Sequence, residues 1–186
     1  MHRIPRSVPG LAQLPRAARG AVIAGLLALA MAAPVAAAQP TRTVYPLHYP
    51  FFTIPAGGAC DFAVEGHPSW GFQASTAFSD GSVQWSVRAH GAYVNPANGD
   101  SYWVEDNWRD RDTFDAGTTL VHSTVNGQAT YFFFPGDQGP YGLVDHVVMY
   151  HIVGTTHATW DSSTYQTYAF DWSGGTITNV CEELSK

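Results

Sequence analysis

The sequence predicts an all-β domain, either a single up-and-down antiparallel β-barrel or a two-sheet β-sandwich, with about seven to nine strands. Two observations lead to this prediction. Apolar and polar residues alternate with a period of two in several segments, and clusters of Gly, Pro, Asn and Asp separate those segments at close spacing. No sustained 3.6-residue apolar period occurs between these clusters. Successive strands joined by short turns favour meander connectivity.

The clearest strand is Val83–Val94, whose odd positions are apolar and whose even positions are mostly polar. One apolar and one polar face are typical of a strand that lies between a core and water. Asn95–Asp100 contains turn-forming residues, and Ser101–Trp108 is expected to return as the next strand. At the end of the chain, Glu182–Leu184 predicts a short helical turn.

A central hairpin is expected over Thr118–Phe134. Asn126-Gly127 lies between two β-rich runs in this segment, and this dipeptide is typical of a type I′ turn. A two-residue loop at this point would place His122 directly opposite Tyr131.

Further strands follow this segment. Pro135–Pro140 is expected to end the hairpin, and Leu143–Val153 is expected to form an apolar strand. Ser173–Thr176 predicts a second hairpin, between Tyr165–Trp172 and Thr176–Cys181.

Residues 1–38 have the layout of a secretory signal peptide, so the single domain is expected to span residues 39–186. Four Arg precede the apolar run Ala21–Ala33, and small residues after Pro34 offer a cleavage site before Gln39. The run is shorter than the roughly 20 residues that a membrane helix needs. We therefore expect a secreted, extracellular protein that is not held in a membrane once the signal peptide has been cleaved.

Residues 39–186 are acidic and rich in aromatic side chains. They keep five of the nine basic residues and all 15 acidic residues, which gives a formal charge of −10. Affinity for nucleic acid and for anionic lipid depends on clusters of Lys and Arg, so neither class of partner is expected. The chain's 10 Phe, 6 Trp and 9 Tyr all lie in this part and exclude an acidic disordered segment.

Cys60 and Cys181 are the two cysteines of the chain. An even number of cysteines in an exported chain predicts a disulfide, here across residues 61–180. In the chain-entropy description, closing so long a loop stabilises the fold by about 5 kcal/mol. A reactive thiol is the alternative, but neither cysteine belongs to a Cys-x-x-Cys motif.

Three short segments carry a family resemblance: Gly58–Val64, Phe134–Asp137 with Gly142-Leu143 after it, and Thr178–Leu184. In these segments the chain resembles small secreted actinobacterial all-β proteins of unassigned function that have one Cys near each end. The resemblance spans the chain after the signal peptide. It implies an all-β domain joined by Cys60–Cys181, and it implies no activity.

Histidines are the first candidates for chemistry, and seven lie beyond residue 38: His48, His67, His90, His122, His146, His151 and His157. His146 and His151 would point to opposite faces of one strand. The interior of a barrel could still gather His122, His146 or His151 from different strands around zinc. We expect instead surface or singly hydrogen-bonded histidines, and predict no metal and no cofactor.

The segment Glu105–Asp112, with Asp115, is the densest group of charges. Its carboxylates suggest a calcium loop or the acid pair of a glycosidase. The spacing does not match a calcium-binding loop, because no Gly follows until Gly117. We therefore expect a solvated loop with internal Arg–Asp pairs.

Aromatic residues are candidates either for core filling, which is common in β-sheets, or for a ligand-binding face. Trp103 and Trp108 flank the acidic segment and are expected to be partly exposed, so they are the candidate ligand-binding residues.

Three functions fit this sequence. The first is a secreted, non-enzymatic β-protein that binds a small apolar molecule or a glycan. The second is a cyclase or isomerase in a lipocalin-like or cyclase-like barrel, where His122, Tyr131 and His151 serve as acid–base groups. The third is a structural or interaction protein of the cell exterior, whose acidic surface keeps it in solution.

Overall fold

A computed structural model describes residues 39–46 and 51–186. The predicted signal peptide, residues 1–38, and His48 lie outside the described residues. The described part is all-β, as predicted, and consists mainly of one antiparallel sheet of eight strands. None of its helices is long and apolar enough to cross a membrane.

Ten strands and one helix make up the described fold. They are β1 (Thr41–Pro46), β2 (Phe52–Ile54), β3 (Val64–Ala77), β4 (Val83–Val94), β5 (Ser101–Phe114), β6 (Leu120–Phe133), β7 (Gln138–Gly139), β8 (Gly142–Leu143), β9 (Val148–Asp161), β10 (Thr167–Asn179) and α2 (Val180–Glu183).

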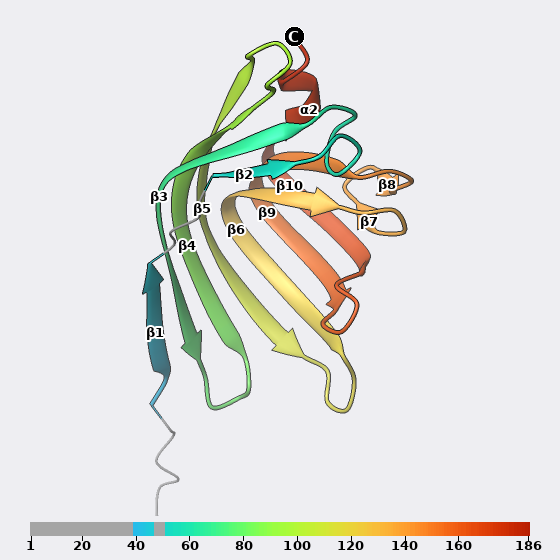
Figure 1. The fold of residues 1–186 in the computed structure, drawn as a ribbon. Coiled ribbons are helices and arrows are strands. Elements are labelled where there is room, and N and C mark those ends of the chain that lie inside the picture. Colours follow the sequence, from blue (N-terminus) through green and yellow to red (C-terminus); the bar gives the residue numbers. More distant parts are fainter. Residues whose placement is uncertain (1–38, 47–50) are drawn as a thin grey trace, which may run out of the picture. The chain divides into compact units, whose positions relative to one another are not determined.

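The large sheet has the order β1-β3-β4-β5-β6-β9-β10, and β2 also pairs with β3. Each long strand therefore pairs with the next long strand of the chain, which confirms the predicted meander. The small strands β7 and β8 pair with each other between β6 and β9. Figure 1 shows that the long strands are strongly curved.

The sequence predicts β4 with the correct bounds, and the turn after it is confirmed. The amide of Gly99 donates to the carbonyl of Asn95 at 2.8 Å within that turn. Both predicted Gly-containing hairpins are wrong. The strand β6 runs without a break through Asn126-Gly127, and β10 passes through Ser173–Thr176 with a shift in its register.

Gly127 bends a strand rather than turning a hairpin. It pairs with Gly154 of β9, and both have positive φ angles, 129° and 139°. A Cβ atom at Gly127 would overlap the carbonyl oxygen of Asn107, and one at Gly154 would overlap that of Gly174. Glycine is needed here because neighbouring backbones approach closely where the sheet curves. The chain reverses instead between β5 and β6, around Gly117.

The predicted disulfide between Cys60 and Cys181 is present. Cys60 belongs to the buried core cluster, with Val64, Met149, Val180 and Leu184. The predicted helical turn is confirmed as α2. Asn179 caps it by accepting the amide of Cys181 at 3.1 Å, and Asn95 donates its side-chain amide to the carbonyl of Leu184 at 3.0 Å. The disulfide and the hydrogen bond from Asn95 thus hold α2 against the rest of the fold.

Candidate functional site

We expected the acidic segment Glu105–Asp112 to be a solvated loop. It forms the middle of β5 instead. Side chains alternate along a strand, so even-numbered residues point to one face and odd-numbered residues to the other. We call the first the inner face of β5; it carries Asp106, Trp108, Asp110 and Asp112. The outer face carries Glu105, Asn107, Arg109 and Arg111.

The expected Arg–Asp pairs do not form within this segment. The guanidinium of Arg111 donates instead to Asp80 Oδ2 at 3.1 Å and to Ser82 Oγ at 2.9 Å, in the connection between β3 and β4. It also lies 4.9 Å from the centre of the Phe78 ring. The positive charge is therefore held on the opposite side of β5 from the inner-face carboxyls.

Asp112 is the centre of a hydrogen-bond network on the inner face. The indole of Trp85 donates to Asp112 Oδ2 at 3.1 Å, and the hydroxyl of Ser123 donates to Asp112 Oδ1. Trp160 in turn donates to Ser123 Oγ at 2.8 Å. Asp112 is buried, and these donors from β4 and β6 give each of its carboxyl oxygens a hydrogen-bond partner.

Asp110 has a different environment, although it lies on the same face. It is opposite Trp85 of β4 and Val125 of β6. Its Oδ1 atom is buried and has no hydrogen-bond partner in the described part of the chain. Burial, and then the neighbouring charge of Asp112, raise the pKa of Asp110 to about 8. At neutral pH Asp110 is therefore mostly protonated.

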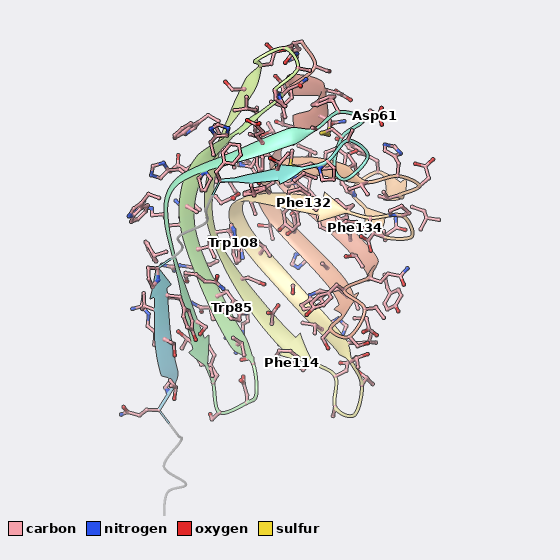
Figure 2. The ribbon with its side chains drawn as sticks, in the orientation of Figure 1. Asp61, Trp85, Trp108, Phe114, Phe132 and Phe134 are labelled. Atoms are coloured by element: carbon pink, nitrogen blue, oxygen red, sulfur yellow. A yellow bond between two sulfur atoms is a disulfide. The ribbon has the colours of Figure 1, made fainter. Side chains whose placement is uncertain are left out.

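An aromatic cavity of about 350 Å³ lies against this face. It is lined by Trp108, Asp110, Ser123, Val125, Ala129, Thr130, Tyr131, Phe132, Phe133, Thr156, Ala158, Trp160, Tyr165, Thr167 and Phe170. Figure 2 shows Trp85 and Trp108 at successive levels along the long strands, and places Phe132 further along β6. Apolar walls with few polar groups are typical of sites for small molecules.

Tyr165 forms a wall of this cavity from the turn between β9 and β10. Its ring stacks on Trp160, with centroids 6.2 Å apart and planes 13° apart. The residue has a φ of 62°, a left-handed conformation that is uncommon for a bulky side chain. Its amide donates to the carbonyl of Asp161 at 2.7 Å, which holds the turn in this form.

Tyr131 lines the aromatic cavity, whereas His122 does not. The two residues lie on the same strand, and their parity places them on opposite faces. The predicted His122–Tyr131 pair is therefore wrong, because the hairpin that would have formed it is absent. The ring of His122 is exposed and lies 3.2 Å from Asp115 Oδ2. Tyr131 shares a hydrogen bond of 2.7 Å with Thr156, and burial raises its pKa to about 12.

His151, another predicted acid–base candidate, is buried beside a second cavity rather than in the first. Its Nδ1 atom is 3.0 Å from the hydroxyl of Tyr102, and its Nε2 atom has no partner among the described residues. Asp106 accepts the amide of Thr130 at 2.7 Å, and burial raises its pKa. Asp106 and Thr130 line the second cavity, of about 300 Å³, with Phe132.

The structure separates the two tryptophans that the sequence favours as ligand-binding residues. Trp108 lines the aromatic cavity. Trp103 lies on the outer face of β5, where 61% of it is exposed and its ring is 5.7 Å from that of His90. Within residues 39–46 and 51–186, no three His, Cys, Asp or Glu side chains are grouped closely enough to hold a metal ion.

Sequence reasoning did not select four residues of this site: Asp110 and Asp112 were considered only as members of the acidic segment, and neither Ser123 nor Trp160 was chosen as a site residue. The alternation Arg109-Asp110-Arg111-Asp112 is the signal that would have found the two acids, since a period of two indicates a strand with different faces. No local pattern marks Ser123 or Trp160, because only strand register brings them to Asp112.

No family model, curated protein or solved structure matches this chain. Its function is therefore inferred from the geometry of the site.

Proposed function

We propose that this protein binds a small organic molecule in the aromatic cavity and is not primarily a catalyst. The observation that supports this most directly is the cavity itself, about 350 Å³ in size and walled by aromatic rings from four strands and the turn between β9 and β10. This volume is in the range of small-molecule sites in proteins. Trp108, Trp160 and Tyr165 offer flat apolar surfaces, which stack well on apolar ligands and on the apolar faces of sugars.

The polar groups of the cavity are few and fixed. Ser123 is held by the bonds it makes with Asp112 and Trp160. Tyr131 is held by Thr156. Groups locked in place before binding lose little entropy when a ligand arrives, so they favour a specific orientation of it.

Tryptophan fluorescence tests this proposal, because two tryptophans line the cavity. The purified protein is titrated with a panel of apolar small molecules, amines, and mono- and oligosaccharides. We expect a saturable change with at least one class, and a loss of that response in Trp108→Ala. Trp103→Ala is the matched control on the outer face and should keep the response. Indifference to the whole panel would refute the proposal, as would a response that Trp103→Ala removes and Trp108→Ala retains.

An acid–base enzyme is the second candidate, with Asp110 in place of the histidines first considered. The carboxyl of Asp110 stays mostly protonated near neutral pH and lies beside that of Asp112, and a carboxyl with a raised pKa is a common acid in acid–base catalysis. If the protein is an enzyme, a ligand found by the panel will be chemically altered after incubation with the native protein. The Asp110→Asn variant would still bind this ligand, and mass spectrometry would then show the ligand chemically unaltered. A ligand recovered unchanged from the native protein would exclude this candidate.

We also propose that the protein is exported, as the predicted signal peptide indicates. The Cys60–Cys181 disulfide supports this, since such bonds persist in oxidising compartments. Mass spectrometry of protein from the culture medium of its native host should find a chain that begins at Gln39. Recovery only from the cell interior, with residues 1–38 still attached, would contradict export.

A further inference from the structure

The lining of the aromatic cavity contains one carboxyl group, that of Asp110, and no basic group. None of the described residues that line it is Lys, Arg or His. Arg109 and Arg111 alternate with the acids on β5 and so lie on its outer face. An anionic ligand would find no cation in this lining to compensate its charge.

We propose that the ligand of the aromatic cavity is an organic cation, an ammonium or quaternary ammonium group with a small apolar substituent. This inference rests on the proposed function and specifies the chemical class of its ligand. Aromatic rings attract cations through the negative potential of their faces, and tryptophan is the most effective ring. A cavity that combines such rings with a carboxylate offers both parts of a cation site.

The rings are fixed before a ligand arrives. Trp160 donates its indole N–H to Ser123, and its ring is stacked on Tyr165. Trp108 lies two residues before Asp110 on β5, so both side chains are on the same face of the strand. A cation in this cavity would therefore share it with the indole rings of Trp108 and Trp160, the phenol ring of Tyr165 and the carboxyl group of Asp110.

The two carboxyls have different parts in this site. Both oxygens of Asp112 already accept hydrogen bonds, from Trp85 and from Ser123. Asp110 lines the cavity and has one oxygen without a partner. Asp110 is thus the acid whose ionisation compensates the charge of a bound cation.

Cation binding is expected to release a proton from the acid pair. The titratable groups that face Asp110 are Asp106 and Asp112 on β5, Tyr131 on β6, and Tyr165 at the end of the cavity. The neighbouring inner-face residues of β4 and β9 do not titrate. Because the pKa of Asp110 is about 8, cation affinity should rise as the pH is raised through that value.

The test compares choline with its neutral isostere, the alcohol in which a carbon atom replaces the nitrogen. The two have the same shape, so a difference in affinity measures the charge. Fluorescence titration of the purified protein should give an affinity for choline at least about tenfold higher than for the alcohol. Asp110→Asn should reduce this ratio severalfold. Glu105→Gln removes the same charge from the outer face of the same strand and should leave the ratio unchanged.

Calorimetry provides a second measurement that does not depend on a variant. Choline titrations in two buffers with different ionisation enthalpies should show proton release near neutral pH. Equal affinity for choline and the alcohol would overturn the cation inference and leave the proposed function standing. If neither choline nor the alcohol binds while a neutral member of the panel does, the cation inference is likewise overturned and the proposed function still stands. Failure of every class would overturn the proposed function itself.

Discussion

Asp110 and Asp112 share the inner face of β5, and the charge of Asp112 adds to burial in raising the pKa of Asp110 to about 8. Their neighbours explain why the two acids differ. Both carboxyl oxygens of Asp112 accept hydrogen bonds, from Trp85 and Ser123, while Asp110 has an oxygen with no donor within the described residues. Asp110 is therefore mostly protonated at neutral pH.

Replacing Asp112 by Asn should lower the pKa of Asp110, because the variant removes the charge that repels its ionised form. Burial remains the larger cause, so the pKa should stay above the ordinary aspartate value of 3.8. Carbon-13 NMR of the side-chain carboxyls as a function of pH measures this directly. Glu105→Gln, on the outer face, serves as the control and should leave the titration of Asp110 in place. An unchanged pKa in Asp112→Asn would mean that the two carboxyls do not interact.

The stability of the protein should fall as pH rises from about 4 to about 8. The folded chain keeps a proton on Asp110 in this interval, whereas the unfolded chain loses it near 3.8, so rising pH favours unfolding. The raised pKa of Asp106 acts in the same direction. Hydrogen bonds lower the pKa of Asp80, Asp145 and Asp161, and these exposed groups affect stability only in more acidic solution.

Urea denaturation at a series of pH values measures this dependence. In Asp110→Asn the slope between about pH 4 and 8 should become shallower, because one of the groups that hold a proton in the folded state is gone. A steeper slope in the variant, or stability in the native protein that rises through this interval, would contradict the assignment.

The sequence predicted those elements of the fold that depend on local pattern. Residues Val83–Val94 alternate over their full length, and the strand has those bounds. Asn126-Gly127 was misassigned because a local turn preference was outweighed by pairing on both sides: β6 pairs with β5 and β9 across this dipeptide. A glycine with positive φ suits a strand bend as well as a turn, and sequence alone does not distinguish the two.

The site was less accessible to sequence reasoning than the fold. Acids are seldom placed on the inner face of a strand, so the charges of Glu105–Asp112 suggested a loop. The donors that make such burial tolerable are Trp85 and Ser123, which are remote from Asp112 in sequence. Only the register of β4 and β6 against β5 reveals that they meet.

Tyr165→Gly should remove a wall of the aromatic cavity with little loss of stability. The left-handed backbone at this position costs a tyrosine about 1–2 kcal/mol, and glycine avoids that cost. Because 75% of Tyr165 is exposed, little apolar burial is lost in exchange. Calorimetric unfolding should show a melting temperature close to that of the native protein, while ligand affinity falls severalfold. Tyr141→Gly is a control for loss of an equally exposed tyrosine outside the cavity, and should leave affinity unchanged.

Gly127→Ala should destabilise the fold more than Gly117→Ala. Both positions have positive φ, so each substitution costs about 1–2 kcal/mol in backbone strain. A Cβ atom at Gly117 enters open space, but one at Gly127 overlaps the backbone of β5. The difference in the free energy of unfolding, measured in urea, therefore reports the close approach of strands at the bend. Equal losses would contradict the placement of Gly127 within β6.

Removing the disulfide should destabilise the domain without changing its cavity. The double variant Cys60→Ser with Cys181→Ser frees a loop with a sequence separation of 121 in the unfolded chain, and should lower the free energy of unfolding by about 2–5 kcal/mol. Neither cysteine lines the aromatic cavity, so ligand affinity measured well below the unfolding transition should be retained. Native protein treated with a reducing agent should match the variant, which controls for the serine side chain at the buried Cys60 position. If instead the reduced and oxidised proteins unfold at the same urea concentration, the bond does not restrain the unfolded chain, and the fold depends on its core and sheet pairing alone.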